Sequence, residues 1–174
     1  MTINDFNLLV TTARGNEDDA CSEIWFLLGK LGDRESIVDK TGISGLITAK
    51  TALNPFEAIE ELKRMLREQP EEFRYILRVI PVEMVIRTNL GEIQRAVNKL
   101  SAKIGENESF RITVEKRHTG LSTRSIIEAA AANIERTVNL DNPYRIVLIE
   151  VLGGLTGISV VKPEDVLSVM KERV

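Results

Sequence analysis

The feature that most constrains this fold is the order of hydrophobic patterns in residues 1–80. Alternation of apolar and polar residues indicates a strand, and apolar residues recurring every three to four positions indicate a helix. The pattern predicts four strands, at 6–13, 35–40, 44–50 and 75–80, and two helices, after Asn16 and after Asn54. Pro81 ends the last strand.

The predicted order in residues 1–80 is therefore β-α-β-β-α-β. This order is typical of a ferredoxin-like domain, in which two helices cover one face of an antiparallel sheet. Because this fold serves many unrelated functions, it does not by itself indicate an activity.

Residues 81–174 carry a different pattern and predict a second, α/β domain. Asn89 and Ser122 are suited to cap helices, the second of which has apolar positions as far as Val138. Residues 109–117 alternate as a strand, and residues 145–152 and 155–161 predict a hairpin that turns at Gly153 and Gly154. A last helix is expected from Pro163. The fold class is α+β.

Composition excludes several classes of protein. The chain has one Cys and one His, which cannot build the usual zinc ligand sets or an internal disulfide, and no Gly-x-x-x-x-Gly-Lys loop occurs. No apolar run is long enough to cross a membrane, and no secretory leader opens the sequence, so a cytoplasmic protein is expected. We expect no cofactor, no metal, no membrane contact and no catalytic residue.

Charge is unevenly distributed along the chain. Residues 1–80 hold 10 basic and 14 acidic side chains, a net of −4, and residues 81–174 hold 13 and 12, a net of +1. The second half is thus the better place for an anionic ligand.

Basic residues gather between Arg111 and Arg124. The candidate binding residues are Arg111, Lys116, Arg117, His118, Ser122, Thr123 and Arg124. Strand alternation continues the buried face to Lys116 and turns Arg117 the other way, and Gly120 permits a turn into the next helix. Free backbone N–H groups at that helix start favour an anion.

Arg124 at the positive end of a helix costs about 0.3 to 1 kcal/mol unless an anion is present. The alternative to an anion-binding site is that these basic side chains are solvated and that each is paired with an acidic side chain. An RNA backbone would relieve the repulsion, and because Phe110 and Tyr144 are the only aromatic residues in this half, contact through phosphates and shape is favoured over base stacking.

The stretch 110–124, the segment Val138-Asn139-Leu140-Asp141-Asn142-Pro143, the strand 147–151 and the run 157–161 together resemble the THUMP domain. The sequence is most similar to stand-alone THUMP proteins that assist tRNA cytidine acetylation, in which a ferredoxin-like domain precedes the THUMP domain. This resemblance implies a domain boundary at 80/81. One departure is Tyr144, which stands where an acidic residue often follows the Asn-Pro turn.

The resemblance also implies a function. It implies an adaptor that binds the acceptor stem and 3′ end of tRNA and presents the tRNA to a separate cytidine acetyltransferase acting in trans. Lys116, Arg117, Ser122 and Arg124 match the basic region of the family. The sequence ends at Val174 without room for a fused catalytic domain, so an RNA-binding protein rather than an enzyme is expected.

Two other readings of the sequence stay open. One is a small methyltransferase, because Asp141-Asn142-Pro143-Tyr144 resembles in part the (Asp/Asn)-Pro-Pro-(Tyr/Phe) motif of amino-methyltransferases, although it has one proline. The other is a regulatory protein whose ferredoxin-like half binds a small metabolite at a dimer interface.

Overall fold

A computed structural model describes residues 5–172 and divides them into two compact units. Unit 1 holds residues 5–82 together with 165–172, and unit 2 holds Glu83–Glu164. Each unit has its own buried apolar core. Within the described residues, no helix is both long and apolar enough to cross a membrane.

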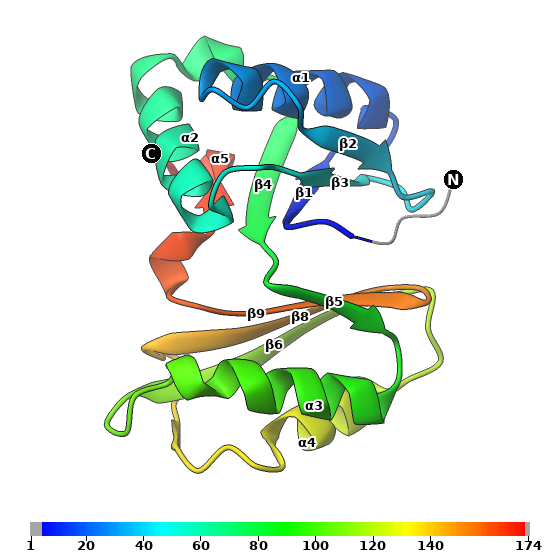
Figure 1. Ribbon diagram of the computed structural model, residues 1–174, viewed down its shortest axis with the longest axis vertical. Helices are drawn as coiled ribbons and strands as arrows, with labels where there is room; N and C mark the ends of the chain where they lie inside the picture. The colour runs from blue at the N-terminus through cyan, green and yellow to red at the C-terminus, as the bar shows by residue number, and fades with distance from the viewer. Residues whose placement is uncertain (1–4, 173–174) are drawn as a thin grey trace. The chain divides into compact units, whose positions relative to one another are not determined.

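Unit 1 is a five-stranded antiparallel sheet with two helices on one face (Figure 1). Its elements are β1 (Leu8–Thr12), α1 (Glu17–Lys30), β2 (Ile37–Lys40), β3 (Leu46–Lys50), α2 (Pro55–Glu68), β4 (Ile76–Pro81), β10 (Leu167–Ser168) and α5 (Val169–Glu172). The strands lie in the order β10-β4-β1-β3-β2. A short 3₁₀ turn, Pro70–Glu72, follows α2.

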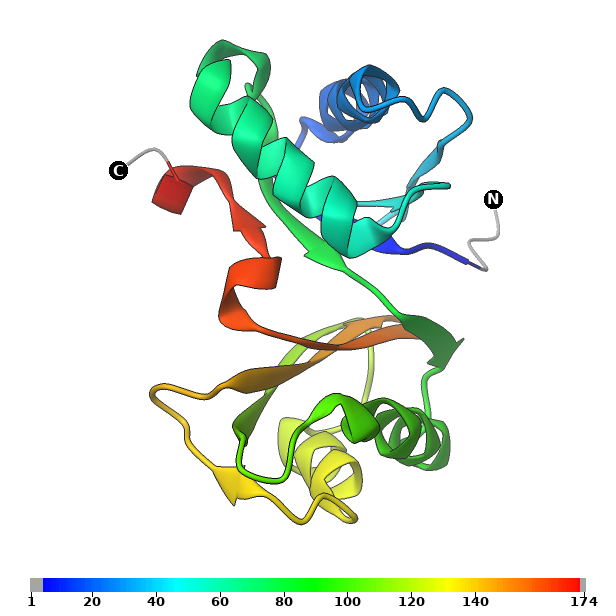
Figure 2. The same ribbon diagram turned by 60° about the vertical axis from the view of Figure 1, so that its left-hand side comes forward.

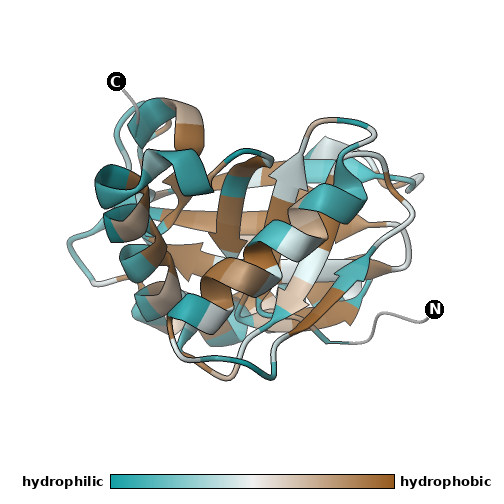
Figure 3. Ribbon diagram, turned by 90° about the horizontal axis from the view of Figure 1, so that it is seen from above, coloured by the Kyte–Doolittle hydropathy of each residue, from teal (hydrophilic) through white to brown (hydrophobic). Residues whose placement is uncertain are grey.

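Local sequence explains where these helices begin. Asn54 caps α2, since its side-chain oxygen accepts the backbone N–H groups of Phe56 and Glu57. Asn16 occupies the corresponding position before α1 but forms no side-chain cap; instead the Glu17 carboxylate accepts the N–H of Gly15. Strands coloured brown for hydrophobic residues lie beneath these helices in Figure 3, where the core of unit 1 forms.

The C-terminal segment departs from the sequence-based expectation. Residues 163–165 form a 3₁₀ turn, and Leu167 and Ser168 then pair with Val79 and Arg78 of β4. Glu172 lies 3.9 Å from Lys63 and 3.8 Å from Arg67 of α2. Figure 2 shows this red segment beside α2 and β4. The segment from Asp165 therefore belongs to unit 1 rather than to a second domain spanning 81–174, and the helix expected from Pro163 is a single 3₁₀ turn.

Unit 1 thus has a fifth strand that the β-α-β-β-α-β pattern does not contain. This strand comes from a segment far beyond its partner in the sequence, since Leu167 pairs with Val79, 88 positions earlier. A two-residue strand carries too little pattern to be seen in a sequence. The ferredoxin-like assignment of residues 1–80 stays a prediction.

The buried carboxylate of Asp33 ties the end of α1 to β3. It accepts hydrogen bonds from Thr51 Oγ1 at 2.6 Å, Ala52 N at 2.9 Å and Glu35 N at 3.0 Å. Burial raises the pKa of Asp33, but these hydrogen bonds outweigh burial and hold the pKa below its usual value. The charged form therefore stabilises the fold.

We expect Asp33→Ala to lower the free energy of unfolding by about 2 kcal/mol at neutral pH, since three hydrogen bonds to a charged group are lost. A depressed folded pKa contributes stability above the unfolded pKa of about 3.9 and loses it as the pH falls through the folded pKa. The difference from the natural protein should thus narrow below about pH 4. Urea unfolding at neutral and acid pH measures it, with the exposed neighbour Glu35→Ala as control. If the difference in free energy of unfolding between Asp33→Ala and the natural protein did not change with pH, the charge of Asp33 would not be its cause.

Unit 2 is a mixed five-stranded sheet with two helices on one face (Figure 1). Its elements are β5 (Met84–Arg87), α3 (Leu90–Leu100), β6 (Ser109–Arg117), α4 (Thr123–Ala131), β7 (Thr137–Val138), β8 (Arg145–Leu152) and β9 (Leu155–Val161). The strand order is β5-β9-β8-β6-β7, in which β6 pairs in parallel with both β7 and β8. A 3₁₀ turn, Ser101–Lys103, follows α3.

The helix caps and the hairpin turn expected from the sequence are present in unit 2. Asn89 and Ser122 cap α3 and α4 by accepting the N–H groups of Glu92 and Ser125. The hairpin of β8 and β9 turns at the expected dipeptide, with Gly153 at φ 63°. The helix expected as far as Val138 is wrong in length, because α4 ends at Ala131 and Val138 lies in β7, where it pairs with Phe110. Residues 84–87 form β5, within the stretch 82–87 that the sequence indicates as a short extended or linking piece.

Candidate nucleic-acid interface

The polar turn between β6 and α4 brings most of the predicted binding residues together. We call Lys116, His118, Ser122, Thr123 and Arg124 the β6–α4 corner; all five are exposed. Lys116 is exposed rather than buried, and its Nζ donates a hydrogen bond to the carbonyl of Leu121 at 3.0 Å. That bond crosses the loop and holds the lysine at the start of the helix.

The start of α4 offers free hydrogen-bond donors. Ser122 caps the helix, its Oγ accepting from Ser125 N at 3.0 Å and donating to Ser125 Oγ at 2.8 Å. The backbone N–H groups of Thr123 and Arg124 have no acceptor within residues 5–172. An anion placed here would receive these N–H groups and the favourable end of the helix dipole.

Arg124 is paired, but weakly. Its Nε lies 2.9 Å from Glu128 Oε1, one turn further along α4, and the two side chains are 89% and 65% exposed. Such exposed pairs on one helix contribute about 0.3 to 0.5 kcal/mol, so a phosphate can compete for this guanidinium.

Arg117 lies on the opposite face of the sheet from Lys116. Its Nη2 is 3.7 Å from Glu150 Oε1 on the neighbouring strand β8, and the side chains are 22% and 5% exposed. Among the described residues, no acceptor is found for its buried Nη1. The carbonyl of Arg117 also accepts the N–H of Gly153 at 2.9 Å. These contacts anchor the end of β6 to the β8–β9 turn.

His118 takes the turn out of the strand in a left-handed conformation, with φ at 55°. It is the only non-glycine residue with positive φ among residues 5–172. Left-handed backbone costs about 1 to 2 kcal/mol for a residue with a Cβ. Strained residues of this kind cluster at functional sites, where the surrounding structure holds them in place.

We expect His118→Gly to be more stable than His118→Ala by about 1 kcal/mol, because both remove the ring and glycine alone tolerates this φ freely. Urea unfolding of the two variants measures the difference. If the imidazole contacts RNA, the two variants should lose the same amount of RNA affinity despite their different stabilities. An alanine variant more stable than the glycine variant would contradict the strain.

Arg111 is not part of the corner. It stands five residues before Lys116 on the same strand, which places their Cα atoms roughly 17 Å apart. Its Nη1 donates to the carbonyl of Leu140 at 3.0 Å, at the other end of the sheet. The predicted binding set is therefore divided by the length of β6.

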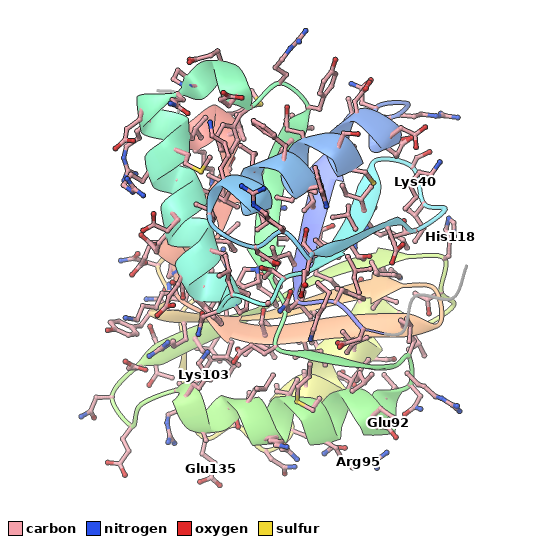
Figure 4. All side chains as sticks on the ribbon, turned by 45° about the horizontal axis from the view of Figure 1, so that its top comes forward. Lys40, Glu92, Arg95, Lys103, His118 and Glu135 are labelled. Carbon is pink, nitrogen blue, oxygen red and sulfur yellow. The ribbon has the colours of Figure 1, made fainter. Side chains whose placement is uncertain are left out.

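The fold adds cations that sequence spacing does not bring to notice. Strands β5, β6 and β8 run in the same direction, so their carboxyl ends meet at one edge of the sheet. Arg87 ends β5 there, and its exposed guanidinium forms no ion pair or hydrogen bond within residues 5–172. Because α3 begins directly after β5, a second helix start with Arg95 in its second turn reaches this edge. In Figure 4, His118 and Arg95 lie toward one end of unit 2, and Lys103 lies toward the other.

The shared direction of strands β5, β6 and β8 is what identifies this edge as a candidate site. Functional groups in sheets with parallel strands gather beyond the carboxyl ends, which a sequence can indicate only when the strand order is known. The sequence does not indicate which strand would lie beside an extended piece at 82–87, so Arg87 could not be assigned to that edge. Arg95 pairs with Glu92 at 2.9 Å and is 69% exposed, which leaves it accessible to a phosphate.

The segment Asp141 to Tyr144 lies at the opposite end of the sheet. Asn139 Oδ1 accepts the N–H groups of Asp141 and Asn142, and Pro143 is buried before β8 begins. This geometry is that of a turn. Gly157 and Ser159 lie in the body of β9, where Ser159 is buried. The described part of the chain contains no group of three or more His, Cys, Asp or Glu side chains able to hold a metal ion.

Comparison with known proteins identifies the fold. No family model and no curated protein matches the sequence. Among solved structures, PH1313 from Pyrococcus horikoshii aligns with a TM-score of 0.67 and 20% identity, covering 93% of this chain and 55% of that one. TrmN from Thermus thermophilus aligns at 0.56 and 17%, covering 90% and 45%.

A 4-thiouridine synthetase solved in complex with RNA and ATP aligns at a TM-score of 0.52 and 13% identity, covering 94% of this chain and 42% of that one. The chain thus spans about half the length of the proteins it matches, with 55%, 45% and 42% of them covered. Nearly the whole of this chain, including both units, shares its fold with part of each of these proteins.

Proposed function

We propose that this protein binds tRNA through the carboxyl edge of the unit 2 sheet and belongs to the THUMP-domain proteins. The observation that carries the proposal is the placement of Lys116, Arg124 and Arg87 at the same end of the unit 2 sheet, near the starts of two helices. Cations and free N–H groups on one edge suit a series of phosphates rather than one small anion. In a chain of net charge −3, exposed cations at this end of the sheet form a local positive concentration that a bound anion would offset.

Two lines of support come from outside the site. The order of sequence features in residues 110–161 resembles the THUMP domain. The fold is shared with a synthetase whose structure contains RNA. Within the site, Arg117 acts in this proposal as a positioning residue that fixes the end of β6 through Glu150, and the corner residues make the RNA contacts.

The finer part of the proposal concerns the role of the bound tRNA. We propose that a ferredoxin-like unit 1 and a THUMP unit 2 together recognise the acceptor stem and 3′ end, and that the protein presents the tRNA to a separate cytidine acetyltransferase. In this proposal the chain described here supplies recognition and its partner supplies the chemistry.

A reconstitution experiment tests this role. Acetylation of intact tRNA by a candidate acetyltransferase is measured with and without this protein, and again with tRNA lacking its 3′ end. We expect stimulation with intact tRNA and a loss of binding with the shortened one. Binding that ignores the 3′ end would contradict the recognition proposed, and methyl transfer by the chain alone in the presence of a methyl donor would replace it with an enzymatic function.

A further inference from the structure

An aromatic hollow lies on the outer surface of α1 in unit 1. We call it the α1 slot; it encloses about 390 Å³ and is lined by Trp25, Phe26, Gly29, Lys30 and Arg34. Its residues take no part in the proposed tRNA site of unit 2.

The two aromatic side chains of the slot are not needed by the core. The buried face of α1 is already complete, formed by Ala20, Ile24, Leu27 and Leu28. Trp25 is 53% exposed and Phe26 is 47% exposed. Adjacent exposed apolar side chains form a patch of the kind found at interaction surfaces, whereas a single exposed one needs no explanation.

Gly29 forms the floor of the slot. It stands four residues after Trp25 and three after Phe26, so it lies on the same surface of the helix. A Cβ built on Gly29 would meet no atom within 4 Å outside its own helix. Glycine inside a helix costs about 0.5 to 1 kcal/mol relative to alanine, and here no close packing requires it. Its small size leaves open space in the slot, which Trp25 and Phe26 also line.

The charged side chains of the slot are both basic, although residues 1–80 carry a net of −4. Lys30 Nζ lies 5.3 Å from the centre of the Phe26 ring and is held by Gln69 at 3.1 Å and Glu72 at 3.5 Å. Arg34 is exposed and has no partner within residues 5–172. One free guanidinium therefore stands beside two exposed aromatic rings.

We propose that the α1 slot binds an unpaired nucleotide of RNA. The base would stack on the exposed rings over Gly29, and Arg34 would pair with the phosphate. An apolar side chain of a protein would use the rings but would leave Arg34 without its counter-charge. The choice of RNA as the source of the nucleotide rests on the proposed function, and the site itself rests on the slot alone.

Trp25 allows direct observation of the slot, since it is the only tryptophan of the chain. The full-length protein is titrated with a single-stranded oligomer of adenosine, with an abasic oligomer of equal length and with adenosine monophosphate, and tryptophan fluorescence is followed. We expect saturable quenching by the adenosine oligomer and none by the abasic one. Saturation by the mononucleotide at the same concentration would overturn RNA as the source.

Gly29→Leu fills the slot without disturbing the core. Because leucine favours a helix more than glycine does, this variant should fold at least as well as the natural protein. We expect its affinity for the adenosine oligomer to fall about tenfold or more, the loss typical of one stacked base. Asn98→Leu, at an exposed neutral position in the last turn of α3 and away from the carboxyl edge of the unit 2 sheet, is the control and should bind normally. Arg34→Gln should weaken binding and make it less sensitive to salt.

The two proposals fail in different ways. If tRNA binds and depends on Lys116 and Arg124, but Gly29→Leu changes neither fluorescence nor affinity, the slot does not bind RNA. If oligomers quench Trp25 but the corner variants bind tRNA normally, the slot stands and the unit 2 site falls. Quenching by the acetyltransferase partner in the absence of RNA, abolished by Gly29→Leu, would make the slot a protein-docking site and overturn this inference.

Discussion

Replacement of Lys116, Arg124 and Arg87 by alanine together is expected to weaken tRNA binding about ten- to a hundredfold at physiological salt. Each exposed charge pair contributes up to about 1 kcal/mol, and each 1.4 kcal/mol changes affinity tenfold. The slope of binding against salt concentration should fall by about 2 to 3, since about one counterion is released for each phosphate contacted. Binding by filter retention or anisotropy across a salt series measures both quantities.

A charge-matched control separates this site from general electrostatic attraction. Arg14, Lys40 and Lys99 are exposed cations outside the carboxyl edge of the unit 2 sheet, and their replacement by alanine changes the net charge equally. We expect this variant to lose far less affinity. Equal losses in the two triple variants, or unchanged affinity in the first, would remove the proposed site. Arg111→Ala, at the other end of β6, should resemble the control.

Arg117→Met is expected to lower the free energy of unfolding by about 3 kcal/mol. The substitution keeps the length of the side chain but removes the guanidinium from a carboxylate that is 5% exposed. Breaking a buried ion pair by removing one partner typically costs about 3 to 5 kcal/mol, and the partial exposure of Arg117 favours the lower value. For a chain of this size the melting temperature should fall by about 6 to 12 °C.

Replacing both Arg117 and Glu150 tests whether an unpaired buried charge causes the loss of stability expected in Arg117→Met. In Arg117→Met/Glu150→Leu no charge is left buried, so stability should recover most of the loss, as with other buried pairs exchanged for apolar residues. A double variant as unstable as the single one would mean that packing, not charge, explains the loss. Because Arg117 precedes the strained His118, the double variant should also bind tRNA less well even when it is folded, if Arg117 positions the corner.

These two predictions divide the basic cluster into residues with different roles. Sequence alone could not make this division, because Arg117 and Glu150 are 33 positions apart and only the pairing of β6 with β8 brings them together. Arg111 was grouped with Lys116 for a similar reason. In the sequence they are close, but an extended strand places them near opposite ends of the sheet.

The sequence by itself determined the local structure. Strand β6 could be read from its alternation at 109–117, the caps Asn54, Asn89 and Ser122 from their side chains, and the β8–β9 hairpin from Gly153-Gly154. These signals act within a few residues, so the chain carries them wherever it folds. The same local chemistry marked the β6–α4 corner as a place for an anion.

Only the tertiary structure decided which distant segments meet. Pairing of β10 with β4, the placement of Arg87 at the same end of the sheet as the corner and the burial of Glu150 against Arg117 all depend on pairings between segments far apart in sequence. Such contacts are selected by the packing of whole sheets and helices rather than by the propensity of any one segment. For this reason the sequence predicts a basic site, and the fold decides which cations face the solvent and which one holds the sheet.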